Sequence, residues 1–112
     1  MDTAFTTINN CLVVVPKTRL DTNNSPEVAE KITEKIEGGE RKVIFDFNKT
    51  DYVSSAGLRV ILVVAKLLKP AEGKMALCNA NDQILEVLEI SGFHSIVKYF
   101  DNLDAATEFV GG

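Results

Sequence analysis

The stretch KVIFDFNKTDYVSSAGLRVILVV, residues 42–64, joins a short apolar run, a polar connection and a long apolar segment. The first run, residues 42–47, is short and apolar, which favours a buried strand. Ser54 and Ser55 then precede an apolar segment with helical spacing. Because a serine at a helix start can accept a hydrogen bond from a backbone N–H of the first turn, the stretch predicts a strand, a loop and a helix capped by Ser54 or Ser55.

The segments before this stretch predict a hairpin and a helix. Residues 4–8 and 12–15 are β-prone runs separated by Asn9-Asn10, which favours two antiparallel strands joined by a tight turn. Ser25 is expected to cap the first helix, with Pro26 at its first position and Gly38-Gly39 at its end.

The segments after it continue the alternation, with a strand from Met75, a helix over 81–91, a strand over 95–99 and a helix over 102–110. The sequence therefore predicts one α/β domain over residues 1–112. Its mixed β-sheet opens with an antiparallel hairpin, continues with parallel strands and alternates with about four α-helices. Function in such sheets gathers at the carboxyl ends of the strands, where we expect the loops 20–25 and 48–55.

The composition excludes several classes of protein. The 112 residues are 46% hydrophobic and 25% charged, as in ordinary globular domains. A formal net charge of −4 with scattered lysines argues against nucleic acid or an anionic membrane as partner. The segment MDTAFTTINN has no features of a secretory signal, so we expect it to begin the fold directly in a cytoplasmic protein. The apolar run near residues 60–65 is far shorter than the ~20 residues that span a bilayer, so no membrane insertion is expected.

The rest of the chain gives little support to a catalytic role for Ser54 or Ser55. A serine nucleophile needs a nearby base, and the only histidine, His94, is expected in a loop before the last strand. The GxSxG elbow and the glycine-rich phosphate loops are absent. Cys11 and Cys78 lie in apolar segments without a CxxC motif, which predicts buried, reduced thiols and neither a metal site nor a cofactor. A nucleotide-binding enzyme remains an alternative, because a helix N-terminus attracts anions.

The helix after the serines has two faces. At spacings of three and four, Ile61, Ala65 and Leu68 are expected to point to the core. The opposite face carries aliphatic side chains among charges: Arg59, Leu62, Val63 and Lys66. This face is either a contact surface or is covered by a neighbouring helix.

The motif YVSSAGL, residues 52–58, with the preceding FDF and the following VIL, resembles the signature of bacterial anti-sigma factor antagonists, the STAS domain family. The resemblance extends over nearly the whole chain in length and element order. It implies a binding module that is not an enzyme and holds no cofactor. Its serine would be phosphorylated by an anti-sigma factor with serine kinase activity. Once dephosphorylated by a serine phosphatase, the module would capture that partner and free a sigma factor, so regulating transcription.

The resemblance assigns roles to individual residues. Alignment on Gly57-Leu58 places the family's phosphorylated serine at Ser55, with Ser54 as the alternative acceptor. Ser54 replaces the aspartate that usually precedes this serine, and Ala56 replaces a frequent hydroxyl residue. The partner-binding residues predicted from the resemblance and the helical face are Asp21, Thr22, Asn23, Ser54, Ala56, Gly57, Arg59, Leu62, Val63 and Lys66. A STAS-like scaffold subunit without phosphorylation remains the other alternative.

Overall fold

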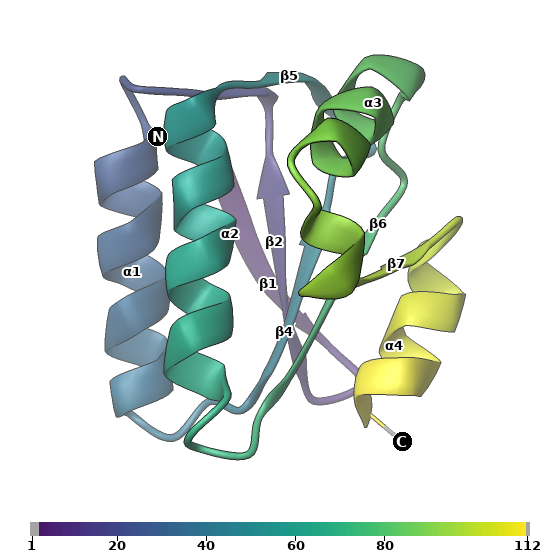
Figure 1. Ribbon diagram of the computed structural model, residues 1–112. Helices are drawn as coiled ribbons and strands as arrows, with labels where there is room; N and C mark the ends of the chain where they lie inside the picture. Colours follow the sequence, from purple (N-terminus) through teal and green to yellow (C-terminus); the bar gives the residue numbers. More distant parts are fainter. Residues whose placement is uncertain (1–2, 112) are drawn as a thin grey trace.

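The structure, a computed structural model, describes residues 3–111 as strands and helices that alternate along most of the chain (Figure 1). The elements are β1 (Thr3–Ile8), β2 (Cys11–Pro16), β3 (Thr18–Leu20), α1 (Ser25–Glu37), β4 (Lys42–Asp46), β5 (Thr50–Val53), α2 (Ser55–Leu68), β6 (Lys74–Cys78), α3 (Asp82–Ile90), the 3-10 helix η1 (Phe93–Ser95), β7 (Lys98–Phe100) and α4 (Leu103–Gly111). The predicted fold class, a mixed sheet with four α-helices, is confirmed. Within residues 3–111, no helix has the length and apolar character needed to cross a membrane.

The opening hairpin forms because two asparagines accept a backbone conformation that most residues avoid. Asn9 and Asn10 have φ angles of 52° and 67°, and a two-residue turn of this kind needs positive φ at both positions. The turn sets the antiparallel register of β1 and β2, in which Ile8 pairs with Cys11. The sheet then continues in the order β1-β2-β4-β6-β7, and every pair after the first is parallel.

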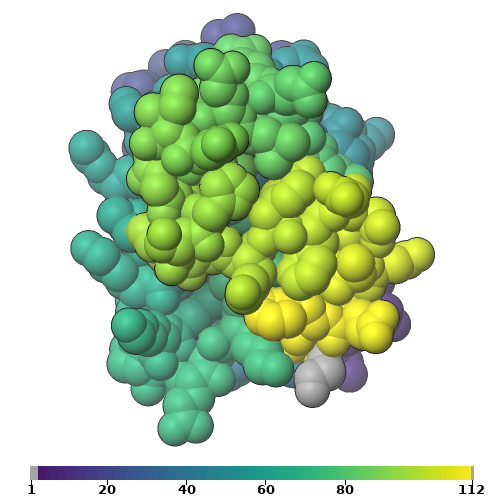
Figure 2. All heavy atoms as spheres, turned by 45° about the vertical axis from the view of Figure 1, so that its right-hand side comes forward, coloured from purple at the N-terminus to yellow at the C-terminus, as the bar shows by residue number. Residues whose placement is uncertain are grey.

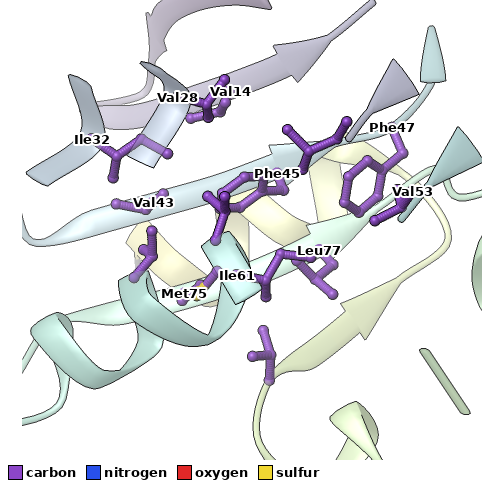
Figure 3. Close-up of a cluster of buried hydrophobic side chains, with 14 of the residues drawn as sticks. Val14, Val28, Ile32, Val43, Phe45, Phe47, Val53, Ile61, Met75 and Leu77 are labelled. Atoms are coloured by element: carbon purple, nitrogen blue, oxygen red, sulfur yellow. The ribbon is translucent and has the colours of Figure 1, made fainter. Parts of the chain in front are cut away.

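The central strands are buried on both faces, and alternate residues point to opposite layers. Phe45 of β4 joins the larger cluster beneath α1, α2 and α3, whereas its neighbour Ile44 joins the smaller cluster with α4. Figure 3 shows Ile32 of α1 and Ile61 of α2 gathered with the sheet residues of the larger cluster. The sheet is therefore a fixed central layer, and the loops at its strand ends take their positions from it.

A second, two-stranded sheet is formed by residues 18–20 and 50–53, and the latter lie within the loop predicted over 48–55. β3 and β5 pair in parallel, with Leu20 opposite Val53. Thr50 anchors β5 by donating its hydroxyl hydrogen to the carbonyl of Pro16, and the Thr18 N–H donates to the carbonyl of Lys49 at 2.8 Å. Strands of three and four residues are too short to show an alternating pattern, so the prediction of loops over 20–25 and 48–55 was wrong in part.

Two further details differ from the predictions. The first helix begins at Ser25, with Asn24 and not Ser25 in the cap position, because the Asn24 side chain accepts from the N–H of Asp21 and donates to the carbonyl of Arg19. The predicted strand over 95–99 is shorter and later, since η1 comes before β7. His94 therefore lies in η1 and not in an irregular loop.

A buried carboxylate ties together the carboxyl ends of β4 and β6. Asp46 accepts hydrogen bonds from the backbone N–H of Asn48 at 3.0 Å and from the side-chain amides of Asn48 and Asn79 at 2.7 and 3.1 Å. Cys11 and Cys78 are free thiols with no exposed surface, as predicted. Burial, reinforced by the Asp46 carboxylate beside it, raises the pKa of Cys78 from 9.0 to about 12.

This shift makes stability fall in alkaline solution. Between pH 9.0 and about 12 the unfolded chain releases the Cys78 proton while the folded protein keeps it. The folded state then binds more protons, so the contribution is complete below pH 9.0 and is lost as pH rises through about 12. From about pH 8 to about pH 10.5, guanidinium unfolding should show a steeper loss of stability for the wild type than for Cys78→Ala. Parallel pH profiles of the two proteins would contradict the assignment.

Candidate functional site

Ser54 and Ser55 have different positions at the start of α2: Ser54 caps the helix, and Ser55 is exposed. Ser54 is the N-cap of α2, with its hydroxyl oxygen accepting from the N–H of Gly57 at 3.3 Å. Ser55 is the first residue of the helix and is exposed, and its hydroxyl makes no hydrogen bond within residues 3–111. The cap predicted for Ser54 or Ser55 is thus Ser54, which leaves the Ser55 hydroxyl free at the positive end of the helix dipole.

The start of α2 is packed directly against the end of β3. The backbone N–H of Ser54 donates to the carbonyl oxygen of Leu20 at 2.9 Å. Gly57 is buried at the same contact, and a Cβ placed on it would lie only 2.5 Å from that carbonyl oxygen. Gly57 therefore contributes close packing to the predicted partner-binding site and has little surface to offer, while Ala56 beside it is half-buried.

The loop after β3 is held rigid by its own side chains. Asp21 accepts the N–H of Asn23 at 2.9 Å through one carboxylate oxygen, and the other oxygen lies 3.7 Å from a guanidinium nitrogen of Arg19. The carbonyl of Asp21 also accepts the N–H of Ser25 at 2.8 Å. Thr22 and Asn23 are exposed at the tip, whereas Asp21 is half-buried. The structure thus brings the Asp21 loop to the Ser54 end of α2, because both are joined to Leu20.

The outer face of α2 matches the predicted spacing, with one exception. Arg59, Val63 and Lys66 are exposed, and Leu62 is half-buried at the edge of the core. Ala65, which was predicted to point to the core, is only half-buried, because it faces a groove beside η1. The face runs from Ser55 along the length of α2, which lies beside α1 in Figure 1.

The short second sheet adds two exposed residues that the sequence analysis did not consider. Arg19 pairs with Tyr52 across β3 and β5, and its guanidinium carbon lies 5.9 Å from the centre of the Tyr52 ring. Tyr52 is 40% exposed, so this cation–π pair forms part of the surface next to the Asp21 loop. The β-prone residues of TDYV, residues 50–53, were the available signal for this strand.

The role of Asn81 at the site was not predicted from the sequence either. Its side-chain oxygen caps α3 by accepting the N–H of Ile84 at 2.8 Å, and its side-chain nitrogen donates to the carbonyl of Asp51 in β5 at 3.1 Å. One amide therefore fixes both the start of α3 and the strand that leads to Ser54. Nothing in the sequence distinguishes this asparagine from an ordinary cap.

His94, the only histidine of the chain, lies far from the serines. His94 lies in η1, and its neighbour Ser95 lines the groove beside Lys66. Lys66 is eleven residues along α2 from Ser55, or roughly 16 Å at the rise of an α-helix, so the structure does not bring the imidazole to the serines. Among residues 3–111, no three His, Cys, Asp or Glu side chains are grouped as metal ligands. What remains at the site is an exposed hydroxyl at a helix start, beside a rigid acidic loop.

A family model for the STAS domain matches residues 3–106, from β1 into α4. The chain belongs to the STAS domain family. The match includes the serine pair, the Asp21 loop and the whole outer face of α2. The family predicted from residues 52–58 is therefore confirmed.

Two relatives of this STAS chain have names that state a function. BtrV of Bordetella bronchiseptica, named as an anti-sigma factor antagonist, is 36% identical over 99 residues, which cover 88% of this chain and 85% of BtrV. The anti-sigma F factor antagonist of Paenibacillus polymyxa is 30% identical over 99 residues, which cover 87% of this chain and 85% of the relative.

Solved structures of STAS proteins share the fold. TM1081 of Thermotoga maritima, described as an anti-sigma factor antagonist, matches with a TM-score of 0.91 at 21% identity, over 96% of this chain and 93% of its own. The anti-sigma factor antagonist SpoIIAA in its unphosphorylated form matches with a TM-score of 0.79 at 19% identity, over 98% of both chains. The phosphorylated form of SpoIIAA, from Bacillus, gives 0.77 at 18% identity, over 96% of this chain and 98% of SpoIIAA.

The close approach at Gly57 gives a direct test of the site's geometry. Gly57→Ala should lower the free energy of unfolding by about 1–3 kcal/mol, because the new Cβ would lie 2.5 Å from the Leu20 carbonyl oxygen and 2.8 Å from a methyl of Val53. Alanine is the better helix former by about 1 kcal/mol, so an uncrowded site would give the opposite sign.

Urea unfolding measures this difference. The matched control is Gly38→Ala. The nearest atom to its new Cβ would be the Glu34 carbonyl oxygen, at the ordinary contact distance of 3.4 Å, so this substitution should change the free energy of unfolding little. A stabilised Gly57→Ala protein would mean that β3 and the start of α2 are not packed as described.

Proposed function

We propose that this protein is an anti-sigma factor antagonist, a binding module without catalytic activity of its own that captures an anti-sigma factor and so frees a sigma factor for transcription. The observation that carries the proposal is the exposed, unengaged hydroxyl of Ser55 at the start of α2, beside the Asp21 loop, in a STAS chain. Relatives named as antagonists at 36% and 30% identity support it. Sigma factors act with RNA polymerase in the cytoplasm, so we place the protein there.

Ser55 is the proposed phosphate acceptor, and the partner anti-sigma factor is the proposed serine kinase. Ser54 is half-buried and its oxygen is occupied by the N–H of Gly57, whereas Ser55 is exposed. A phosphate carries about −1.5 to −2 charges at neutral pH. At a helix N-terminus such a charge is favourable by roughly 0.3–1 kcal/mol, so the fold should tolerate it. That structures of SpoIIAA are known in phosphorylated and unphosphorylated forms supports a switch of this kind.

The acceptor can be tested in the native host. From cells that express tagged variants, Ser55→Ala should carry no phosphate, while Ser54→Ala should keep it, because only the Ser55 hydroxyl is free. Mass spectrometry of the purified proteins gives both the phosphorylated residue and the co-purified partners. A phosphate that persists on Ser54 in the Ser55→Ala protein would overturn the choice of serine. A bound partner with no phosphate on either serine would favour the scaffold alternative.

The proposed partner surface surrounds Ser55. It comprises the Asp21 loop with Thr22 and Asn23, and the outer face of α2 with Arg59, Leu62, Val63 and Lys66. Val63 is the exposed large aliphatic residue of this face, at 37%, and lies between cations. An apolar contact ringed by charges is a common arrangement for a protein interface. Ser54 and Ala56 flank the hydroxyl at the edge of the same surface.

Phosphorylation should weaken binding without unfolding the protein. A charged group at the interface must be desolvated, and without a matched cation in the partner this costs on the order of several kcal/mol. Ser55→Glu, which adds about half the charge of a phosphate, should therefore weaken binding to the anti-sigma factor by roughly 100-fold or more. Its melting temperature should remain close to that of the wild type. Calorimetric titration and thermal unfolding measure the two quantities.

The matched control is Asn102→Asp. Asn102 accepts the N–H of Ala105 at the start of α4, so aspartate keeps the cap and adds one negative charge at a helix start on the other face of the sheet. Its affinity for the partner should be unchanged. Undiminished binding by Ser55→Glu and by the phosphorylated protein would exclude the proposed switch.

A further inference from the structure

A groove lies between the C-terminal half of α2 and the segment that follows α3, away from Ser55. It encloses about 530 Å³ and is lined by Leu62, Ala65, Lys66, Leu68, Lys69, Gly73, Met75, Ser95, Ile96 and Val97. Ile96 stands at its edge with 51% of its surface exposed. Figure 2 shows the face on which α3 and η1, in green, lie between α2, in teal, and α4, in yellow. The groove combines aliphatic side chains with Lys66, Lys69 and Ser95, and the described part of the chain leaves it uncovered.

The groove is bordered by positive charge on an acidic protein. Between Ser55 and Ala71 the chain has three cations, Arg59, Lys66 and Lys69, and no carboxylate. Since the formal net charge is −4, the rest of the chain carries −7. Within residues 3–111, Lys66 and Lys69 belong to no ion pair, because the single salt bridge joins Arg19 to Asp21. An occupant of the groove should therefore combine an apolar side chain with carboxylates.

The outer side of α3 has this chemistry. Ile90, at its last position, is 79% exposed, more than any other large hydrophobic side chain described in residues 3–111. Glu86 and Glu89 precede it at spacings of four and one, and both are exposed. Glu86 and Ile90 lie on the same side of the helix, and Glu89 borders them. The helix thus presents an isoleucine beside two carboxylates, in a form that could enter the groove of another molecule.

We propose that a second copy of this chain covers the groove, with Ile90 of each copy in the groove of the other and with Glu86 and Glu89 against Lys66 and Lys69. The two surfaces are close in the fold, because Ser95, which lines the groove, follows Ile90 after only four intervening residues. Two such neighbouring surfaces can pair reciprocally about a twofold axis and close as a dimer. The groove shares Leu62 and Lys66 with the proposed partner surface, whereas Glu86, Glu89 and Ile90 lie outside that surface, so changes on α3 test the dimer separately from partner binding.

The association is weak and depends on salt. One groove and one helix end on each copy bury less than about 1,200 Å² in total, the range of transient interfaces, so we expect a dissociation constant on the order of 100 μM. Exposed ion pairs are screened at high ionic strength, so dimerisation weakens as salt is added. Sedimentation velocity of the whole chain from about 10 μM to 1 mM covers the expected transition.

Two charge-reversed proteins test the pairing. Lys66→Glu/Lys69→Glu makes the groove acidic, and Glu86→Lys/Glu89→Lys makes the outer side of α3 basic. Alone, each protein sets like charges against each other in both contacts and should remain monomeric. Mixed in equal amounts, they pair an acidic groove with a basic helix and a basic groove with an acidic helix, so the heterodimer should form with about the wild-type affinity.

Matched controls separate pairing from net charge. Lys17→Glu/Lys35→Glu and Glu27→Lys/Glu30→Lys change the net charge equally at exposed positions outside the groove and α3, and both should dimerise as the wild type does. Ile90→Ser, at an exposed position, should abolish dimerisation with the fold intact by circular dichroism. A wild type that stays monomeric at about 1 mM, an unaffected Ile90→Ser protein, or a mixture that does not associate would each overturn the proposal.

Discussion

The contact between the Leu20 carbonyl and the start of α2 determines the geometry of the whole site. The carbonyl accepts the N–H of Ser54 at 2.9 Å, and the chain can come this close only because Gly57 has no side chain. This contact carries the Asp21 loop, which follows Leu20 directly, to the first turn of α2. The pairing of Leu20 with Val53 brings the two segments side by side, and the Leu20–Ser54 contact fixes the loop against the first turn of α2.

The layers beneath explain why the contact is held in place. β4 lies in the middle of the sheet, with Phe45 in the larger core cluster and Ile44 in the smaller one, so helices pack on both of its faces. At its carboxyl end, Asp46 fixes the turn through Asn48, and beyond it Asn81 holds the backbone of Asp51. A buried carboxylate such as Asp46 is costly unless its hydrogen-bond partners are present, so its bonds to Asn48 and Asn79 specify the start of the path from β4 to α2. An exposed serine on such a support can gain a charge without disturbing the structure below it.

Local patterns in the sequence predict most of the helices and strands, whereas contacts between distant segments cannot be seen in it. The hairpin followed from two asparagines, and the buried strand and the apolar helix followed from residues 42–64. The strands β3 and β5 were missed because each depends on the other for pairing. The cap of α1 was placed one residue late, since Asn24 is used to fix the preceding loop.

At the site, too, the local arrangement of the serines was predicted from the sequence, whereas contacts between distant segments were not. The choice of Ser55 over Ser54 agrees with its exposure, because the motif defines a local arrangement at the helix start. Tyr52, Arg19 and Asn81 come together only through strand pairing and contacts between distant segments. Only the folded chain shows these contacts.

The burial of both thiols has a practical consequence for following this protein in solution. Cys11 and Cys78 have no exposed surface, and burial keeps the pKa of each above its ordinary value, so neither is present as an accessible thiolate at neutral pH. A cysteine introduced at Thr22, which is exposed at the tip of the Asp21 loop, would then be the one thiol that a maleimide dye reaches. The protein can carry a single fluorophore beside Ser55 with its native cysteines left in place, and the dye would report each arrival and departure of a partner in real time.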